Sequence, residues 1–432
     1  MDSIWTKTAK RTHFPTQERD IRTDVLIIGG GMAGILCAHM LGCAGVNYAL
    51  VEANEICSGI TKNTTAKITL QHGLFCDKLL RTFGEERARG YLEANAAALS
   101  KYRKMCKDID CDFEEKDAFV YSKDNRAKIE KEVTAFERLG FDAKFESDLK
   151  LPFSVAGAVK IGKQAQFHPL KFAFSLAQGL NIFENTKVLE FLPNGVRTNR
   201  GRINAEKIIV ATHFPMINKH GSYFLKLYQH RSYVLAFENA ADVEGMYIDE
   251  DKKGLSFRNQ GEFLLLGGGS HRTGKKGGGW AELAGFAKVT YPNAREVYRF
   301  ATQDCMSLDG VPYIGKYSAR TPNLYVAAGF NKWGMTSSMV SAMILADLVQ
   351  GRENEYTRIF SPSRSVLRPQ LALNAAHAIA GILTPTVPRC PHMGCALKYN
   401  AQERSWDCSC HGSRFTEKGK LIDNPATEDK KS

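Results

Sequence analysis

The sequence predicts an α/β fold built on a parallel sheet, with a separate small module at the C-terminal end. Two segments, at residues 24–43 and 323–349, each have the pattern of an apolar strand, a glycine-rich turn and a helix. The third observation is a group of four cysteines and two histidines between residues 390 and 411. The length of 432 residues allows two or three domains, and 44% hydrophobic and 24% charged residues are ordinary for a globular protein.

The first glycine-rich segment has the spacing of a dinucleotide-binding turn. Residues 25–28 form a continuous apolar run, which is typical of a buried parallel strand. Gly29, Gly31 and Gly34 follow in the order G-x-G-x-x-G: the first permits a tight turn, the second a close approach of the pyrophosphate, and the third close packing of helix on strand. A dinucleotide is therefore the predicted ligand, and a glycine-rich turn in an unrelated α/β fold is the alternative.

A carboxylate ends the next predicted strand and a second glycine turn follows much later. Glu52 comes directly after the apolar residues 48–51, where an acid can hold a ribose 2′-OH and repel a 2′-phosphate. In the second unit, Gly329 and Gly334 lie between a strand and a helix. The N-terminus of that helix can stabilise the electron-rich N1–C2=O edge of a flavin. An NAD enzyme has no need of this feature, so FAD is the predicted cofactor.

The C-terminal group of cysteines and histidines has the ligand set of an iron–sulfur centre. Cys390 and His392 form a Cys-x-His pair, and Cys408 and His411 form a Cys-x-x-His pair. A Rieske [2Fe–2S] cluster needs two thiolates on one iron and two imidazoles on the other. The same four side chains suit tetrahedral zinc, although zinc sites commonly pair Cys with Cys and His with His. Each loop here supplies one Cys and one His, which favours the cluster and leaves zinc as the alternative.

Further segments resemble the D-amino-acid-oxidase-like FAD oxidoreductases, and specifically the bacterial branch that is fused to a C-terminal Rieske module. The matching segments cover nearly all of residues 22–425 and include 58–67, 166–169, 210–215, 267–271, 304–315 and 329–336. The cluster motif resembles the Rieske subtype in which the two remaining cysteines, Cys395 and Cys410, form a disulfide. Compared with a complete Rieske domain, this chain is expected to keep only the cluster-binding part. We expect this part to be stabilised by contacts with the linker helix or the FAD domain.

The resemblance implies a discontinuous FAD-binding, Rossmann-like domain, an interleaved mixed α+β substrate domain and a small all-β cluster module. The FAD domain is expected at residues 22–75, 155–230 and 305–355, and the substrate or cap domain at 76–154 and 231–304. Residues 356–388 are expected to form a linker with a short helix, and residues 389–432 the Rieske module. Composition makes residues 77–148 look mostly helical and residues 262–267 look like a strand.

The resemblance also implies which residues contact FAD. These are Gly29, Gly31, Gly34, Glu52, Thr61, Thr64, Thr65, Val188, Gly329, Gly334, Met335 and Thr336. Lys332 and Trp333 are candidates for the flavin edge, and a surface lysine at a helix start is the alternative for Lys332.

Substrate residues are harder to name from the sequence. Arg231 and Tyr233 begin a predicted strand of the second domain, and an arginine there can hold a carboxylate bidentately. Arg258 and His271 lie further along, and a structural role is the alternative for each of these four residues. His72 follows the flavin loop and is either a proton-handling group or a hydrogen-bonded structural histidine. His168, which precedes a proline at a turn, is expected to be structural.

These features predict an FAD-dependent oxidoreductase. An amine or amino acid, as the small reduced substrate, is expected to give a hydride to the flavin, and electrons then pass singly through the cluster, with a one-electron carrier protein as a possible partner. The alternatives are a flavin and iron–sulfur electron-transfer or redox-sensing protein without an organic substrate, and an enzyme acting on modified tRNA. The net charge of +12 permits the last, but the sequence has no block of five or six Lys or Arg residues, so no nucleic-acid partner is expected.

The sequence also bears on the compartment. The first twenty residues are polar and lack the apolar core of a signal peptide. No apolar run approaches the ~20 residues of a membrane span; the longest, at 371–383, suits a packed helix. Of eleven cysteines, four lie in the cluster motif, and the remaining seven are scattered as reduced thiols would be. A cytoplasmic location is expected, in which a Cys395–Cys410 disulfide would be an exception.

Overall fold

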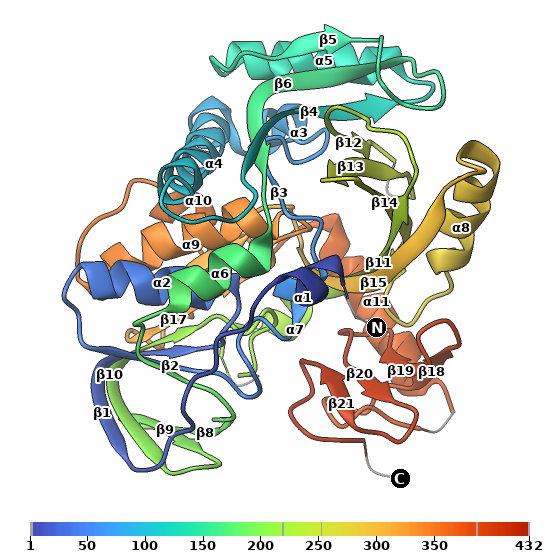
Figure 1. The fold of residues 1–432 in the computed structure, drawn as a ribbon. Coiled ribbons are helices and arrows are strands. Elements are labelled where there is room, and N and C mark those ends of the chain that lie inside the picture. The colour runs from blue at the N-terminus through green and yellow to red at the C-terminus, as the bar shows by residue number, and fades with distance from the viewer. Residues whose placement is uncertain (1–2, 218–219, 252, 386–387, 431–432) are drawn as a thin grey trace.

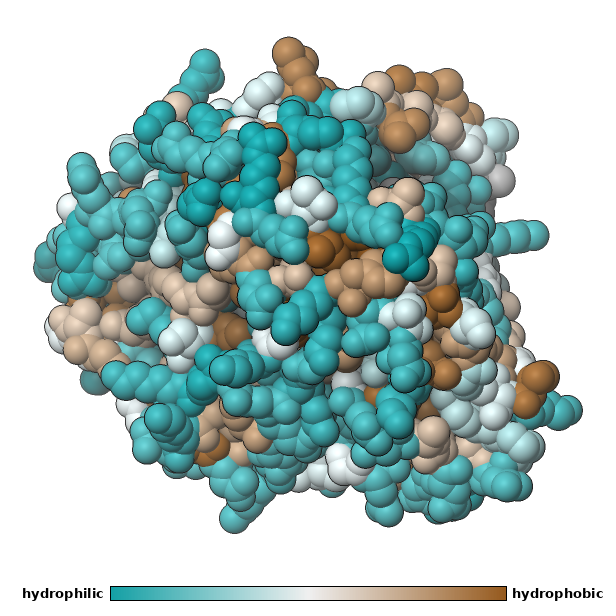
Figure 2. Space-filling model, turned by 90° about the horizontal axis from the view of Figure 1, so that it is seen from above, coloured by the Kyte–Doolittle hydropathy of each residue, from teal (hydrophilic) through white to brown (hydrophobic). Residues whose placement is uncertain are grey.

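The computed structural model describes residues 3–217, 220–251, 253–385 and 388–430, and three sheets organise them (Figure 1). An eight-stranded sheet holds the glycine motifs, a nine-stranded sheet lies beside it, and a four-stranded sheet forms the C-terminal module. Hydrophilic side chains cover most of the face seen from above, and hydrophobic ones appear in scattered groups between them (Figure 2). Within the described residues, no helix is both long and apolar enough to cross a membrane.

The eight-stranded sheet has a parallel centre formed by strands that are far apart in the sequence. Its central order is β16-β17-β10-β1-β2-β7, and β8 and β9 extend it through β10. Pairing is parallel between β17, β10, β1, β2 and β7 and antiparallel at β16 and β9. The strands are β1 (Ile21–Ile28), β2 (Tyr48–Val51), β7 (Ile182–Phe183), β8 (Val188–Leu192), β9 (Gly195–Thr198), β10 (Arg202–Val210), β16 (Tyr313–Lys316) and β17 (Leu324–Ala328).

Alternate residues of β1 enter two different cores, as a strand buried on both faces requires. Val25 and Ile27 pack into the core that includes helices α2 (Met32–Cys43) and α9 (Gly334–Val349). Leu26 and Ile28 pack into the core on the other face of the sheet. The parallel α/β region predicted from the two glycine-rich units is therefore present.

The nine-stranded sheet is mostly antiparallel and has the order β15-β11-β14-β13-β12-β4-β6-β3, with β5 paired to β6. Its strands are β3 (Lys67–Ile68), β4 (Glu114–Ser122), β5 (Lys144–Glu146), β6 (Gly157–Gln166), β11 (Leu227–Glu238), β12 (Met246–Asp249), β13 (Ser256–Gln260), β14 (Phe263–Arg272) and β15 (Arg295–Ser307). The strand expected at residues 262–267 is the first part of β14. The short strand β3 and the ten-residue strand β6 belong to this sheet although they adjoin segments of the other one, and the proposed domain boundaries stay a prediction.

The remaining helices lie between and around the two large sheets. They are α1 (Ile4–Thr8), η1 (Ile60–Asn63), α3 (Cys76–Phe83), α4 (Glu85–Met105), α5 (Arg126–Arg138), α6 (Pro169–Ala177), α7 (Tyr223–Lys226), α8 (Gly279–Thr290) and α10 (Thr357–Phe360). Residues 77–148 were expected to be mostly helical, and they contain α4, α5 and most of α3. The same stretch also contains β4 and β5, so the expectation was wrong for these strands. Pairing with β6 and β12 outweighs the helix-favouring composition.

The C-terminal module is a small sheet attached to a helix. Its strands β18 (Leu397–Asn400), β19 (Ser405–Cys408), β20 (Arg414–Thr416) and β21 (Leu421–Asp423) pair in sequence order. Helix α11 (Pro369–Leu383) precedes it, close to the apolar stretch noted in the sequence. Seven buried residues form the module's own core: Cys390, Cys395, Leu397, Cys408, Cys410, Phe415 and Ala426.

Candidate functional site

Three glycines shape the turn between β1 and α2, and each does so differently. Gly29 has φ +112°, and a Cβ there would lie 2.6 Å from the carbonyl oxygen of Ala211. A Cβ on Gly34 would overlap the carbonyl oxygen of Gly29, so only glycine lets α2 pack this closely on the strand. Gly31 lines a cavity and has open space at its Cβ position, except for Thr61 Oγ1 at 3.4 Å. This geometry fits a phosphate-binding turn.

Glu52 follows β2 with its carboxylate held at the cavity wall. Its Oε2 accepts a hydrogen bond from the Gly30 amide at 2.7 Å, and its Oε1 accepts one from the Asn54 amide at 2.9 Å. Burial raises the pKa of Glu52, while these amides act in the opposite direction. The carboxylate is therefore oriented beside the glycine turn, as expected of a residue that is predicted to hold a ribose 2′-OH.

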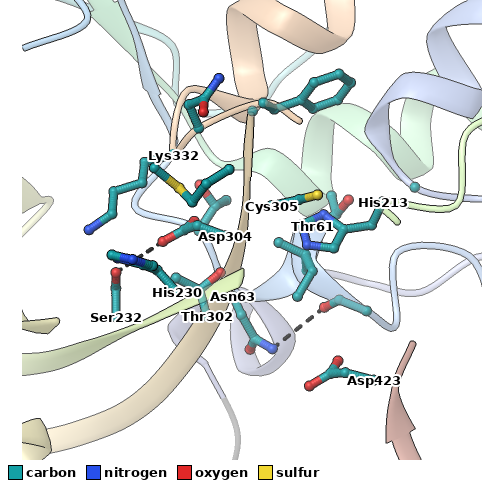
Figure 3. A pocket seen from close by; sticks show the side chains of 18 of the residues that line it. Thr61, Asn63, His213, His230, Ser232, Thr302, Asp304, Cys305, Lys332 and Asp423 are labelled. Carbon is teal, nitrogen blue, oxygen red and sulfur yellow. Dashed lines mark hydrogen bonds between the residues drawn. The ribbon is translucent and has the colours of Figure 1, made fainter. Parts of the chain in front are cut away.

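The cavity has a volume of about 910 Å³ and runs from the glycine turn to the nine-stranded sheet (Figure 3). Parts of the chain that are distant in sequence share its wall: the β1–α2 turn, the loop around η1, the end of β10, strands β11, β14 and β15, the start of α9, and the C-terminal module. Asp304, Lys332 and Ser232 lie at one end of the view, and Asp423 of β21 lies at the other. This volume is near the upper end of the range for ligand-binding pockets, roughly 300–1,000 Å³.

The loop around η1 presents three threonines at this wall. Thr61 Oγ1 accepts a hydrogen bond from the Met32 amide at 3.1 Å, which joins the loop to the first turn of α2. Thr64 Oγ1 accepts from the Ala66 amide at 2.9 Å, and the Thr64 carbonyl accepts from Trp5 Nε1 at 2.7 Å. Thr65 and Val188, at the start of β8, also line the cavity. Thr61, Thr64, Thr65 and Val188, four of the residues expected to contact FAD, thus line the same cavity.

The second glycine turn lies across the cavity. Helix α9 begins at Gly334, and its N-cap residue Trp333 makes no side-chain capping hydrogen bond. Asn331 holds the turn: its Nδ2 donates to the carbonyls of Gly329 at 2.6 Å and Gly310 at 3.0 Å. Of the residues expected near the flavin here, Lys332, Trp333, Gly334 and Met335 line the cavity. Lys332 Nζ donates to Ser270 Oγ at 3.1 Å.

His72 is engaged on both sides of its ring. Its Nδ1 accepts from the Tyr91 hydroxyl at 2.6 Å, and its Nε2 faces the Thr69 carbonyl at 2.9 Å and Thr336 Oγ1 at 3.1 Å. The ring also stacks on Trp333 at a centroid distance of 4.6 Å. Burial lowers the pKa of His72 to about 3. Of the two roles that the sequence allowed, this setting favours the structural one.

His168 is also structural, as expected. It is the N-cap of α6, where its Nδ1 accepts a hydrogen bond from the Lys171 amide at 3.2 Å.

Two buried cations that act on each other, Lys67 at the cavity wall and Arg258, could not be predicted as a pair from the sequence pattern. Lys67 of β3 lines the cavity, and burial, with a smaller effect of Arg258, lowers its pKa to about 7. Arg258 of β13 is fully buried and donates to the Thr65 carbonyl at 2.8 Å. Arg258 was considered as a substrate group, but its guanidinium is used to hold the threonine loop. Lys67 lies in segment 58–67, which resembles the family, but no motif spacing identifies it as a functional residue.

Strands β11, β14 and β15 present a polar patch to the cavity. Ser232 Oγ donates to Asp304 Oδ2 at 3.0 Å and lies 3.1 Å from Ser270 Oγ (Figure 3). His230, from the same face of β11, is directly opposite Asp304 in the sheet register. This patch combines hydroxyls, an imidazole and a carboxylate. Its residues could not be predicted as a group from the sequence, because strand periodicity does not tell which face of a strand meets a cavity.

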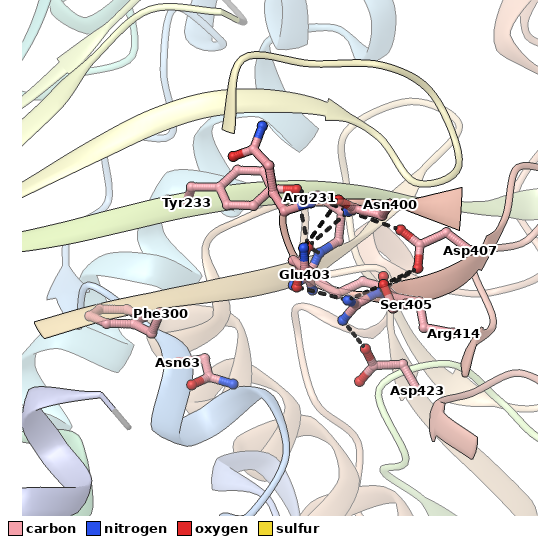
Figure 4. A network of polar contacts seen from close by, with 12 residues as sticks. Asn63, Arg231, Tyr233, Phe300, Asn400, Glu403, Ser405, Asp407, Arg414 and Asp423 are labelled. Atoms are coloured by element: carbon pink, nitrogen blue, oxygen red, sulfur yellow. Dashed lines mark hydrogen bonds and ion pairs between the residues drawn. The ribbon is translucent and has the colours of Figure 1, made fainter. Parts of the chain in front are cut away.

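Arg231 and Tyr233, the residues expected to meet substrate, turn toward the C-terminal module (Figure 4). Arg231 forms a buried, bidentate ion pair with Glu403, in which Nε donates to Oε1 at 2.9 Å. The Tyr233 hydroxyl donates to the same Glu403 oxygen at 3.0 Å and contacts His271 Nε2 at 3.0 Å. Arg231 therefore holds a carboxylate, but that carboxylate belongs to the protein, and a substrate role for it is not supported.

Glu403 belongs to a larger buried network of charges. Arg414 donates to Glu403 at 2.7 Å, to Asp407 at 3.0 Å and to Asp423 at 3.0 Å. Burial opposes the charge of Arg414, but the three carboxylates outweigh it and raise its pKa. Burial likewise opposes the charge of Glu403, and the two arginines outweigh it, so its pKa is lowered. The network ties the module to β11.

The four expected cluster ligands converge in the module. The thiols of Cys390 and Cys408 are hydrogen-bonding neighbours, and the rings of His392 and His411 are 4.9 Å apart between centroids. His411 Nδ1 is buried and has no hydrogen-bond partner among the residues that the structure describes. Cys395 and Cys410 form a disulfide, as the resemblance implied. Two thiols, two imidazoles and a buried ring nitrogen without a hydrogen-bond partner in the described part of the chain fit a Rieske cluster.

Comparisons with known proteins agree with both sites. Residues 24–348 match the FAD dependent oxidoreductase (DAO) family, and residues 361–432 match the Rieske [2Fe-2S] domain. The chain is 35% identical to YhfW of Bacillus subtilis (strain 168), described as a Rieske 2Fe-2S iron-sulfur protein, over 98% of this chain and 96% of that one. It is 23% identical to gamma-glutamylputrescine oxidoreductase of Escherichia coli (strain K12), over 85% of this chain and 95% of that one.

Solved structures share the fold of the larger part. Glycine oxidase from Geobacillus kaustophilus superposes with a TM-score of 0.67 at 20% identity, covering 80% of this chain and 100% of that chain. L-proline dehydrogenase from P. horikoshii superposes with a TM-score of 0.68 at 17% identity, covering 80% of this chain and 98% of that chain.

The Rieske match also decides between iron–sulfur and zinc, because the ligand pairs Cys390–His392 and Cys408–His411 fall inside the matched domain. The glycine turns and the cluster loops thus lie within two recognised domains of one polypeptide. The chain belongs to the FAD dependent oxidoreductase (DAO) family, with a Rieske [2Fe-2S] domain at its C-terminal end.

Proposed function

We propose that this oxidoreductase oxidises an amine or an amino-acid-like molecule and releases the electrons singly through its cluster to a one-electron acceptor protein. The observation that carries the proposal is the shared cavity: the glycine turns, the polar patch on β11, β14 and β15, and the C-terminal module all line it. The related gamma-glutamylputrescine oxidoreductase, named for an amine-containing compound, supports this substrate class.

FAD would be held by the residues that the structure gathers around the cavity. The α2 turn with Gly29, Gly31 and Gly34 would take the pyrophosphate, and Glu52 would take a ribose. The other contacts would come from Thr61, Thr64, Thr65, Val188, Gly334 and Met335 at the cavity wall. Gly34, Gly329 and Thr336 do not line the cavity and would shape the segments that hold the cofactor. When bound, FAD supplies acceptance of a hydride from an organic donor and release of single electrons.

The protein's own groups would bind and orient the substrate. The Asp304 carboxylate attracts a protonated amine, and the hydroxyls of Ser232 and Ser270 offer further hydrogen bonds beside it. Lys332 Nζ reaches the same serine pair through Ser270, and it can bind an anionic group of the substrate. A molecule that carries both an amine and a carboxylate matches these charges, which is why an amino-acid-like substrate is proposed.

The cluster would be held by Cys390, His392, Cys408 and His411. Two histidine ligands raise the potential of such a cluster above that of an all-cysteine cluster, so it can accept electrons from a flavin. The cytoplasmic location and the lack of a nucleic-acid partner remain predictions from the sequence.

The substrate class can be tested by anaerobic titration of the purified protein with amines, α-amino acids and γ-glutamylated amines, each added separately. A true substrate should bleach the flavin absorbance and produce the EPR signal of a reduced [2Fe–2S] cluster. A Cys408→Ser variant is the control, because its flavin should bleach without that signal. If dithionite reduces the flavin fully and no compound of these classes does, the proposed substrate class is wrong.

A further inference from the structure

The second cluster loop, residues 408–413, is fastened to the nine-stranded sheet through its main chain. Four consecutive carbonyl oxygens of this loop accept hydrogen bonds from side chains of the sheet. Arg272 donates through Nε to Ser409 at 3.3 Å and through Nη2 to Cys410 at 3.1 Å. Gln229 Nε2 donates to the His411 carbonyl at 2.9 Å, and Gln303 Nε2 donates to the Gly412 carbonyl at 2.8 Å.

The two glutamines are buried and tightly packed against the loop. Gln229 is 1% exposed and Gln303 is 0% exposed, so their amides depend on partners inside the protein. Gln303 Oε1 accepts from Thr273 Oγ1 at 3.2 Å, which fixes the direction of its amide. Gly412 has φ +92°, and a Cβ there would lie 2.6 Å from the Cβ of Gln229. The contact is thus close enough to require glycine in the loop.

The same two strands also form the wall of the cavity. Successive side chains of a strand point to opposite faces, so β11 directs His230 and Ser232 to the cavity while Gln229 meets the cluster loop. On β15, Asp304 faces the cavity and Gln303 faces the loop. Along these two strands the sheet lies between the cavity and the carbonyl of a cluster ligand, and residues 420–424 of the module reach the cavity wall beside it.

We propose that Gln229, Gln303 and Arg272 are positioning residues for intramolecular electron transfer, because they fix the His411 loop on the reverse face of the sheet that walls the FAD cavity. The proposal rests on the proposed function and adds to it a defined place of transfer within one chain. Each transfer moves one electron from FAD reduced by substrate to the oxidised cluster, where one ferric ion becomes ferrous. The external acceptor protein then takes that electron, and the released proton goes to solvent.

The test uses a flash experiment that needs no organic substrate. Photoreduced 5-deazariboflavin delivers electrons to the full-length holoprotein, and absorbance follows their redistribution between flavin and cluster. In the unmodified protein the rate should be independent of protein concentration. The double variant Gln229→Met/Gln303→Met keeps side-chain length but removes both amides. It loses the bonds to His411, Gly412 and Thr273, and the one that Gln229 Nε2 donates to the Asn424 carbonyl at 2.9 Å. With these four hydrogen bonds lost, the rate should fall about tenfold.

Gln166→Met is the matched control. Gln166 is equally buried and donates to the Asn259 carbonyl at 2.8 Å, but it lies on β6, toward the other edge of the same sheet. The Gln166→Met variant should leave the transfer rate unchanged. The cluster EPR spectrum and the midpoint potentials of both centres should be unchanged in all variants, so that a slower rate reports position and not altered chemistry.

Two outcomes overturn the inference: a rate that rises with protein concentration in the unmodified protein, or an unchanged rate in the double variant with both cofactors intact. If the double variant does not fold, the single variants Gln229→Met and Gln303→Met serve the same comparison. Failure of the proposed function looks different, because the flash-driven transfer would persist while no amine or amino acid bleached the flavin.

Discussion

The FAD region holds its cofactor site with main-chain geometry, whereas the cluster module holds its site with side chains. In the first, Gly29 and Gly34 leave room that no other residue leaves, and two extensive cores support the sheet behind them. In the second, seven buried residues make the whole core, and cysteine, histidine and charged side chains supply the remaining order. The difference predicts that the larger region can fold on burial of apolar surface, while the module depends on its cluster and on its contacts with β11 and β15.

The largest expected effect comes from removing a cluster ligand. Cys390→Ser or Cys408→Ser should abolish the cluster and leave FAD bound, because the two sites are built from different segments. The unmodified protein should contain about two irons and two acid-labile sulfides per chain. Iron and sulfide analysis, EPR and flavin absorbance measure these outcomes. Cys43→Ser, at an exposed free cysteine, is the control. A normal cluster EPR signal in either ligand variant would contradict the assignment.

Breaking the buried charge network should be the next largest effect. Arg414→Met leaves Asp407, Glu403 and Asp423 without their shared cation, which is expected to cost about 3–5 kcal/mol. Denaturant unfolding followed by cluster absorbance should show this loss before flavin fluorescence changes. Arg404→Met removes an exposed ion pair with Glu417 and should shift neither probe measurably. Equal shifts in both probes would show that the two regions unfold as one unit.

Lys67→Met should stabilise the FAD region in a pH-dependent way. Burial lowers the pKa of Lys67 from its ordinary 10.5 to about 7, so the folded chain binds this proton more weakly than the unfolded chain. Below pH 7 both states carry the charge and folding bears the full cost of burying it. That cost falls as the pH rises from 7 to 10.5 and is absent above that range. In protein freed of FAD, the variant should be more stable by up to roughly 5 kcal/mol at pH 6.

Thermal unfolding of the two FAD-free proteins between pH 6 and pH 10 checks this expectation. The difference between them should shrink steadily as the pH rises. Bound FAD, which carries negative phosphates, should reduce the difference at pH 6. A difference that stays constant over the range would mean that Lys67 does not titrate as its burial implies.

A matched pair of glycine variants separates the packing role of the FAD turn from its binding role. Gly34→Ala places a methyl group against the Gly29 carbonyl and should destabilise the protein by about 1–3 kcal/mol or more. Gly31→Ala meets only open cavity and Thr61 Oγ1, so the protein should fold normally and bind FAD less tightly. Unfolding curves and FAD titration of the apoprotein measure the two effects. Equal loss of stability in both variants would contradict this division.

The smallest expected effect is a change in the cluster's midpoint potential. The Ser413 hydroxyl is a hydrogen-bonding neighbour of Cys390. Cys408 lowers the pKa of that thiol most, burial opposes this, and the His392 amide and then the Ser413 hydroxyl lower it further. A donor to a cluster sulfur stabilises the extra electron of the reduced state. Ser413→Ala should therefore lower the potential. Protein-film voltammetry measures the shift. Phe415→Tyr, which adds a hydroxyl in the module core beside the ligands, should raise the potential. An unchanged potential in both variants would rule out this account.

Much of the fold could be predicted because local signals were strong. The runs of apolar residues before Gly29 and Gly329 predicted two strands of the parallel sheet, and Cys and His spacing predicted the ligands in the module. The presence of β4 could not be predicted, since its Lys and Glu residues also suit a helix and only its partners β6 and β12 select a strand.

The site was less predictable because its residues act through distant partners. Arg231 looked like a carboxylate-binding residue and it is one, but its partner Glu403 lies 172 residues further along the chain. Gln229 and Gln303 have no motif, and their role follows only from the position of the loop that contains His411. Strand periodicity separates residues 229 and 231 from residues 230 and 232. It cannot say which set meets a ligand and which meets another part of the protein.

The alternation along β11 has a consequence for redesign of this protein. A new substrate preference would be sought by replacing His230 or Ser232, which face the cavity. Each of these shares a peptide bond with a residue that contacts the module: Gln229 on one side and Arg231 between them. A bulkier side chain on the cavity face would shift the backbone of β11, and with it the position of the second cluster loop, residues 408–413. Variants selected for better substrate binding would therefore also have to be selected for electron transfer to the cluster, because β11 contacts both the cavity and the cluster loop.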